Sequence, residues 1–288
     1  MATRRKTAAV PLGILAGSGS LPLTVARAAQ QAGRPVHIVA IEGHADPAIE
    51  SFPHSWVNMG RVGAILKALD SAKCRDLVII GAVDRPNLED VRLDMGGVRS
   101  ILTILSLTIG GDDRLLGNVV RFFEGKGLRV IGAHEVAPGL LAPRGTLGRR
   151  KPSRTDLDDI RLGARVIAAL GPMDVGQSAV VLRQHVIAVE AVEGTDAMLA
   201  RAATLRKWGL LARFKRSGVV VKGSKPGQDR RVDMATIGPE TVRQAAAAHL
   251  AGIAYSAGAV IIVDREAMIA EANRAGLFLH GFSATKKG

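Results

Sequence analysis

The sequence has one cysteine, Cys74, and few aromatic residues, which make up 3% of its 288 positions. A lone cysteine excludes an internal disulfide and a cysteine-cluster metal site, so a reduced, cytoplasmic setting is expected. Scarce aromatics, abundant aliphatic residues and 33 glycines favour α/β architecture over an aromatic-rich β-sandwich. No apolar run approaches the about 18 to 20 residues that a membrane span needs.

Negative charge is also scarce, because 26 acidic residues face 39 Lys and Arg and leave a formal net charge of +13 at pH 7. The basic residues are not interleaved with aromatics as in nucleic-acid-binding strips, so no nucleic-acid partner is expected. An anionic substrate, an anionic membrane surface and a basic composition without a partner all remain open. Near acidic lipid each basic group would contribute roughly 1 kcal/mol.

Short apolar runs alternate with helical patterns in the first half of the chain. Strands are predicted at residues 10–16, 36–41, 76–81 and 128–131, and helices at residues 23–31, 62–72, 101–109 and 113–124. Fully apolar strands alternating with helices predict a Rossmann-like parallel sheet covered on both faces. Ligands of such sheets bind at the carboxyl ends of the strands.

A glycine turn, Gly17-Ser18-Gly19-Ser20, follows the first predicted strand and precedes the first predicted helix. Free backbone N–H groups and the helix dipole would make this turn an anion cradle. Pro22 stands where a dinucleotide fingerprint has its third glycine or alanine, although Glu42 lies near the place of a ribose-binding acid. A nucleotide-binding turn and a plain tight turn both remain open.

Residues 138–152 are rich in Pro, Gly and Arg and predict a linker between a first domain, residues 1–137, and a second α/β domain, residues 153–288. Helices of the second domain are predicted at residues 155–170, 197–206, 244–251 and 265–275, and strands at 179–182, 186–190, 218–221, 259–263 and 277–280. The 155–170 helix is expected to be capped by Ser153 or Thr155. Residues 193–196, just before a helix, suit an anion, a metal or a simple cap.

The densest charge lies in residues 221–242, which carry Lys222, Lys225, Asp229, Arg230, Arg231 and Asp233. Cations beside a few acids in a loop between strand and helix suit a bound polyanion, although a solvated basic loop with a capping acid is also open. No Ser-His-Asp order or nucleophile elbow stands out. Glycine turns, isolated carboxylates and cations favour Mg²⁺-dependent hydrolysis of a phosphate or pyrophosphate, with Asp233 as general base or metal ligand.

A set of long motifs makes a resemblance specific. LGILAGSGSLP, GAVDRP, GAHEV, LAPRGTLG, DVGQSAVV, AVEAVEGTDAML, QDRRVDMATIG, AGIA and VDREAMI occur in this order and spacing. From residue 12 to about residue 281 the chain thereby resembles the LpxI-type UDP-2,3-diacylglucosamine pyrophosphatases of Gram-negative lipid A synthesis. The resemblance implies two α/β domains with the substrate bound between them. It also implies Mg²⁺-dependent hydrolysis to 2,3-diacylglucosamine 1-phosphate (lipid X) and UMP, with water attacking the sugar-side phosphorus.

The same resemblance assigns site residues. Asp233 is expected to be catalytic because it follows Arg231 and Val232 ahead of the triplet 236–238. Ser18 and Ser20 stand where relatives can have glycine, which is a departure in the turn. The expected substrate-binding residues are Gly17, Ser18, Gly19, Ser20, Asp84, Arg85, Asp112, Asp113, His134, Gln177, Glu193, Gly194, Thr195, Asp196, Lys225, Gln228, Arg231 and Thr236.

The expected partners are a lipid-linked UDP-sugar and an anionic inner-membrane surface, with a homodimer left open. Two other functions are also open. An NAD(P)-dependent oxidoreductase would draw on the glycine turn and Glu42, and a non-catalytic nucleotide-sugar binding protein would bind UDP without turnover.

Overall fold

The computed structural model describes residues 9–83, 112–225 and 227–283. The chain forms two compact units, one made of Met1–Pro138 and Asp229–Asp233 and the other of Gly139–Gln228 and Met234–Gly288. The prediction of two contiguous domains is therefore wrong in one respect, because a short segment from the second half of the sequence belongs to the first unit. Among the described residues, no helix combines the length and the apolarity that crossing a membrane requires.

The first unit contains a five-stranded parallel sheet of order β3-β2-β1-β4-β5. Its strands are Leu12–Ala16 (β1), Val36–Ile41 (β2), His54–Val57 (β3), Asp76–Ile80 (β4) and Arg129–Val130 (β5). Its helices are Leu21–Gln31 (α1), Val62–Ser71 (α2), Asp112–Glu124 (α4) and Ala133–Val136 (α5), with a 3₁₀ turn at Pro47–Ser51. The predicted Rossmann-like sheet is confirmed. The helix predicted at residues 101–109 lies outside the described residues, as do Asp84 and Arg85.

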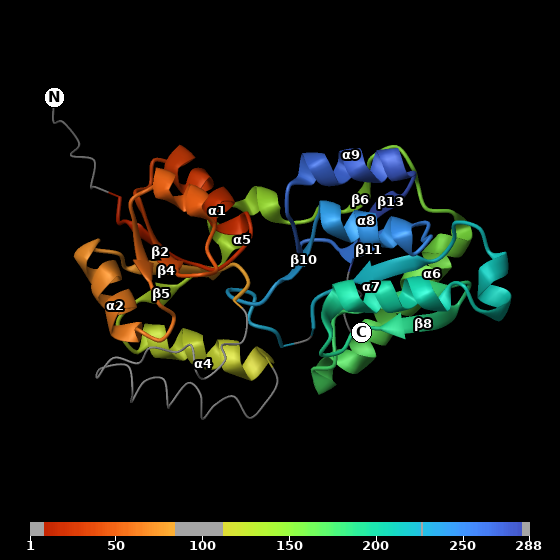
Figure 1. Cartoon of the computed structure of the whole chain (residues 1–288), viewed down its shortest axis with the longest axis horizontal. Helices are drawn as coiled ribbons and strands as arrows, with labels where there is room; N and C mark the ends of the chain where they lie inside the picture. Colours follow the sequence, from red (N-terminus) through yellow and green to blue (C-terminus); the bar gives the residue numbers. More distant parts are fainter. Residues whose placement is uncertain (1–8, 84–111, 226, 284–288) are drawn as a thin grey trace. The chain divides into compact units, whose positions relative to one another are not determined.

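Helices cover both faces of this sheet, as its fully apolar strands require (Figure 1). One face packs against α2 and α4, whose Leu69 and Phe123 share a cluster with Leu77 of β4 and Val130 of β5. The buried Cys74 belongs to the same cluster. On the other face α1 contacts α5.

The second unit is built on a mixed six-stranded sheet of order β6-β13-β11-β9-β7-β8, with a separate parallel pair, β10-β12. Its strands are Gly145–Leu147 (β6), Ser178–Leu182 (β7), His185–Val189 (β8), Val219–Lys222 (β9), Ala235–Ile237 (β10), Gly252–Ser256 (β11), Val260–Ile262 (β12) and Phe278–Phe282 (β13). Its helices are Arg154–Leu170 (α6), Gly194–Leu205 (α7), Pro239–Ala247 (α8) and Arg265–Ala275 (α9), with 3₁₀ turns at Pro138–Leu140, Gly171–Met173 and Gly209–Arg213. Strand β11 runs parallel to β9 and β13, and β7 and β8 form an antiparallel hairpin.

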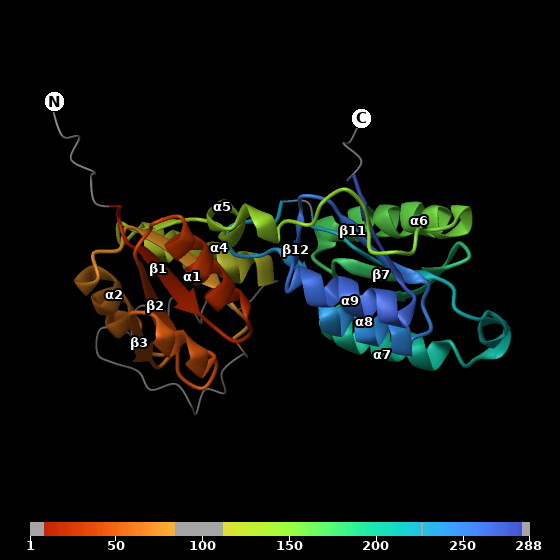
Figure 2. The same cartoon turned by 90° about the horizontal axis from the view of Figure 1, so that it is seen from above.

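Alternating side chains along these strands divide the core into two layers. Val220 and Leu279 join a cluster with residues of α7, α8 and α9. Val221 and Phe278, one position away on the same strands, join a second cluster with residues of α6. Figure 2 shows α6 on one side of the sheet and the other three helices on the opposite side.

Of residues 138–152, predicted as the inter-domain linker, all but Pro138 are grouped with the second unit. Within them β6 pairs antiparallel with β13, and Arg150 Nη1 donates a hydrogen bond to the Gly276 carbonyl at 2.6 Å. The Pro- and Gly-rich composition removes helical periodicity but does not prevent a three-residue strand at the edge of a sheet.

Helix α6 begins with a capping box at Ser153. The Asp156 amide donates to Ser153 Oγ at 3.2 Å, and the Ser153 amide donates to Asp156 Oδ2 at 2.8 Å. We expect Ser153→Ala to lower the free energy of unfolding by about 1 kcal/mol, measured by urea denaturation. Thr155→Ala is the matched control, because Thr155 is exposed inside the helix and alanine favours helix there. Equal losses for both variants would contradict Ser153 as the cap.

Candidate active site

The switch point of the first sheet lies between β1 and β4, whose connections leave in opposite directions along the sheet. The turns that follow these strands contact each other directly. The Gly17 amide donates to the Ile80 carbonyl at 2.9 Å, and the Ser18 amide and hydroxyl donate to the Ala82 carbonyl at 2.8 and 3.0 Å. A Cβ on Gly17 would stand 2.5 Å from the Ala82 carbonyl oxygen, so only glycine fits this approach.

The start of α1 completes the turn. Gly19 has a φ of +90°, and no atom of the described residues lies within 4 Å of the place where its Cβ would be. Ser20 is the N-cap residue but makes no side-chain cap hydrogen bond, and Pro22 stands in the first turn, where its missing N–H costs nothing. The first-turn N–H groups of α1 therefore border an open position of the kind that binds phosphate in other α/β proteins.

His134 lies just beyond the carboxyl end of β5. Its half-buried ring is within 2.4 Å of the position that a Cβ on Gly132 would take, so Gly132 gives the ring its room. Burial, and next the charge of Arg230, lower the pKa of His134. Nδ1 of His134 is buried and has no hydrogen-bond partner among the described residues. Both effects favour the neutral form of this imidazole, which lies at the carboxyl-end edge of the sheet.

The segment Asp229–Asp233 brings Asp233 into the first unit, which also carries the Gly17–Ser20 turn. The amides of Val232 and Asp233 both donate to the Asp229 carbonyl, at 3.1 and 2.9 Å, so the segment is a tight turn. Val232 packs against the cluster of α2, α4 and β4 described above. Asp233 itself is half-buried at the end of this turn.

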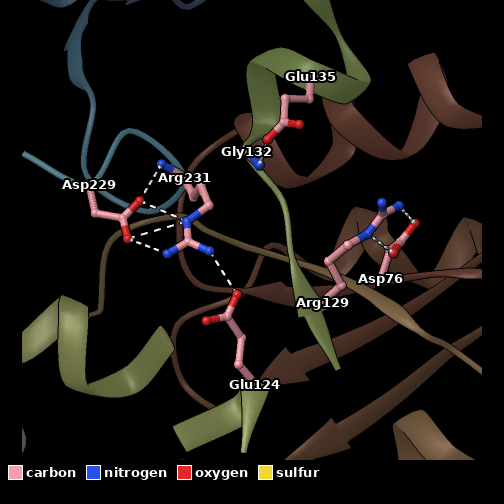
Figure 3. A network of polar contacts seen from close by, with 7 residues as sticks. All are labelled: Asp76, Glu124, Arg129, Gly132, Glu135, Asp229 and Arg231. Carbon is pink, nitrogen blue, oxygen red and sulfur yellow. Dashed lines mark hydrogen bonds and ion pairs between the residues drawn. The ribbon is translucent and has the colours of Figure 1, made fainter. Parts of the chain in front are cut away.

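Arg231, predicted to bind substrate, forms hydrogen bonds with two carboxylates (Figure 3). Its Nε and Nη2 donate to Asp229 Oδ1 and Oδ2 at 2.9 and 2.7 Å, and its Nη1 donates to Glu124 Oε1 at 2.7 Å. The guanidinium hydrogen bonds hold the pKa of Asp229 below its ordinary value.

Four residues predicted for the second unit, Gln177, Thr195, Lys225 and Gln228, belong to one hydrogen-bonded chain of contacts. The Gln228 side-chain amide donates to Gln177 Oε1 at 3.4 Å, and Gln228 Oε1 accepts from the Lys225 amide at 3.3 Å. Lys225 forms an ion pair with Asp174, which the sequence analysis did not single out.

The same network continues through a buried lysine. Lys222 Nζ donates to Thr195 Oγ1 at 2.7 Å, and that hydroxyl donates to Glu190 Oε1 at 2.9 Å. Burial lowers the pKa of Lys222, while Glu190 and Asp196 oppose the shift. Lys222 and Glu190 were not predicted as site residues. The available signal was a lysine that ends an otherwise apolar strand, Val219–Lys222, inside the densest charged stretch.

Other predicted residues are placed elsewhere. Glu193 pairs with Arg201 at 2.6 Å, Asp196 is exposed in the first turn of α7, and Thr236 lies in β10 with its hydroxyl donating to the Met234 carbonyl. Gly194 begins α7 with a φ of +81°. Asp112 and Asp113 begin α4.

At the start of β4, away from the glycine turn, Asp76 forms ion pairs with two arginines, of which Figure 3 draws Arg129. Arg129 donates from Nε and Nη2 at 2.7 and 2.9 Å, and Arg34 also pairs with it. The hydrogen bond from Arg129 is the main cause of a lowered Asp76 pKa, which burial opposes.

A pH-dependent stability follows from Asp76. Since its pKa is lower in the folded chain than in the unfolded chain, its ionised form stabilises the fold above the unfolded pKa, and this contribution is lost as pH falls through the folded pKa. We expect Asp76→Asn to cost about 1–2 kcal/mol in urea denaturation at pH 7 and much less at pH 3. Asp70→Asn, at an exposed position of α2, should change little at either pH. A cost for Asp76→Asn that does not shrink at pH 3 would contradict the ion pairs.

The fold and the glycine turn define the class of protein. It is a two-unit α/β protein, and the sheet of its first unit is organised like the parallel sheets that bind nucleotides. Comparison with known proteins gives the family. The LpxI N-terminal domain matches residues 11–140, and the LpxI C-terminal domain matches residues 143–280. The UDP-2,3-diacylglucosamine pyrophosphatase LpxI of Caulobacter vibrioides is 40% identical over 270 residues, 94% of this chain and 96% of the relative. The chain belongs to the LpxI family.

Proposed function

We propose that this chain hydrolyses the pyrophosphate of UDP-2,3-diacylglucosamine to UMP and 2,3-diacylglucosamine 1-phosphate in lipid A biosynthesis. The observation that carries the proposal is the 40% identity, across nearly the whole length of both chains, to a protein named for this activity. The glycine turn at the switch point supports it, because a UDP-sugar offers the phosphates that such a turn binds.

In the proposed reaction the N–H groups at the start of α1 bind phosphate oxygens, and Asp233 acts on the attacking water. Water adds to the sugar-side phosphorus, the bond from that phosphorus to the bridging oxygen breaks, and UMP leaves with the bridging oxygen. As general base Asp233 would accept the proton of the water. As a metal ligand it would instead orient a water bound to Mg²⁺.

Mg²⁺ is part of the proposal. Within the described ranges, no three His, Cys, Asp or Glu side chains gather as metal ligands. Mg²⁺ commonly needs fewer, because one or two carboxylates combine with water and substrate phosphates. Asp233 fits that smaller donor set. The ion would neutralise charge on the pyrophosphate oxygens.

In the second unit we propose that Gln177, Lys225 and Gln228 supply polar contacts to the substrate. Their mutual hydrogen bonds hold them together near the end of β9, which supports a common role. We also propose a cytoplasmic protein that works peripherally at the inner membrane, supported by the net charge of +13. Sedimentation with anionic liposomes at low salt tests this, and a protein that stays in the supernatant would contradict it.

The activity is tested by incubating the purified chain with UDP-2,3-diacylglucosamine and Mg²⁺ and measuring UMP release. We expect release with Mg²⁺ and none with a chelator. Two measurements distinguish the alternatives. A change of NADH fluorescence on binding would favour an oxidoreductase, and tight UDP binding without UMP release would favour a binding protein.

A further inference from the structure

Each of the three guanidinium nitrogens of Arg231 donates a hydrogen bond to a carboxylate. The guanidinium spans two carboxylates, with a two-pronged contact to Asp229 and a single contact to Glu124. Arg231 also donates its backbone amide to Asp229 Oδ1 at 3.1 Å. With one cation between two anions, this group has a net charge of −1. Such a cluster does not attract a pyrophosphate.

These contacts close the turn that ends in Asp233. Asp229 accepts from Arg231 through its side chain and from the Asp233 amide through its carbonyl. Glu124 is the last residue of α4 and precedes Arg231 by 107 positions in the sequence. Its carboxylate accepts a hydrogen bond from Nη1, on the other side of the guanidinium. Between Arg231 and Asp233, Val232 packs against the core of the first unit. The turn is therefore fixed at its start, at its middle and on its outer side.

We propose that Arg231 is a positioning residue: through Asp229 and Glu124 it fixes the turn that presents Asp233, and it does not bind the substrate phosphates. This inference rests on the proposed function and on the role of Asp233 in it. Arginine suits the task because its planar fork reaches two carboxylates at once, which lysine cannot do.

Loss of the Arg231 contacts is expected to affect the rate of hydrolysis more than the stability of the fold. Arg231 and Glu124 have 37% and 38% of their side-chain surface exposed, and ion pairs at such exposure add little to folding stability. A displacement of about 1 Å in a catalytic group, however, can cost about 100-fold in rate. Loss of the contacts should therefore lower kcat without unfolding the protein.

Glu124→Gln distinguishes positioning from phosphate binding, because it removes the negative charge of a partner of Arg231 and leaves the arginine unchanged. We expect kcat to fall by about 3- to 10-fold with KM unchanged, and Arg231→Lys to lower kcat by about 10- to 100-fold, also with KM unchanged. If Arg231 bound phosphate, Arg231→Lys would raise KM and weaken UDP binding, while Glu124→Gln would leave kcat intact and lower KM. That second pattern overturns the proposal.

A matched control is Glu240→Gln, which removes the exposed carboxylate of another Arg–Glu pair, with Arg243 on α8. It should leave kcat and KM at wild-type values. A fall in kcat equal to that of Glu124→Gln would show a general effect of charge and overturn the assignment.

Amide hydrogen exchange gives a readout that does not need turnover. In Glu124→Gln and Arg231→Lys we expect the amides of Val232 and Asp233 to exchange faster than in wild type, because their turn is less firmly held. Unchanged exchange would overturn the positioning role even if kcat fell. If the wild-type chain released no UMP but the two variants still exchanged faster, Arg231 would position the turn as proposed. Only the proposed function would then be rejected.

Discussion

Asp233→Asn is expected to lower kcat for UMP release by about 10² to 10⁴-fold, the range typical for loss of a general acid or base. The substitution keeps the size of the side chain but removes its charge. The asparagine side chain cannot accept the proton of the water, and it is a poor ligand for Mg²⁺. Asp233 lies at the end of a tight turn whose Val232 packs in the core of the first unit. The fold should therefore survive, with thermal unfolding close to that of wild type.

The control for this substitution is Asp158→Asn on α6, where the carboxylate pairs with Arg161 on the surface. It should leave kcat unchanged. UDP affinity of the Asp233 variant, measured by calorimetry, should resemble that of wild type, because the substitution removes catalysis and leaves the glycine turn intact. A variant that turns over at the wild-type rate would remove Asp233 from the chemistry.

Gly17→Ala is expected to lower both stability and activity. The new Cβ would stand 2.5 Å from the Ala82 carbonyl oxygen and 2.8 Å from backbone atoms of Gly81, so the turns after β1 and β4 must move apart. The hydrogen bonds between Ser18 and Ala82 would lengthen or break. We expect a loss of about 1–3 kcal/mol in urea denaturation, as for overpacking, and at least a tenfold loss of kcat/KM.

Gly117→Ala in α4 is the matched control, because no described atom outside the helix's own backbone lies within 4 Å of the position of its new Cβ. Alanine replaces glycine inside a helix there, so stability should rise by about 0.5–1 kcal/mol. Wild-type stability in Gly17→Ala would contradict the close contact between the two turns.

Local patterns were sufficient to predict several helices and strands in both units, although not every central one. The apolar run of β2 and the pattern of α9 predicted the bounds that the structure shows, Val36–Ile41 and Arg265–Ala275. Strand β3, His54–Val57, was missed because it is a short edge strand with half-buried polar residues. Strand β11, Gly252–Ser256, was missed because small residues and glycine give a weak strand signal, although it is central and fully buried.

The site was only partly predictable. The motif placed Asp233 in a loop between a strand and a helix, but nothing local showed that this loop belongs to the first unit. The partner of Arg231, Glu124, stands 107 positions away, so nothing local predicted this ion pair. In the sequence, Lys222 is one of several cations in a charged stretch. It is buried because it belongs to β9, which pairs with β11 inside the sheet. Contacts between distant residues decide these roles.

Hydrolysis in water enriched with ¹⁸O tests the central claim most directly, because it reports both that the pyrophosphate is cleaved and where water attacks. The purified chain, UDP-2,3-diacylglucosamine and Mg²⁺ would be incubated, and both products analysed by mass spectrometry. The account predicts one ¹⁸O in the 2,3-diacylglucosamine 1-phosphate and none in UMP. Label in UMP would contradict attack on the sugar-side phosphorus, and the absence of both products would contradict the proposed function.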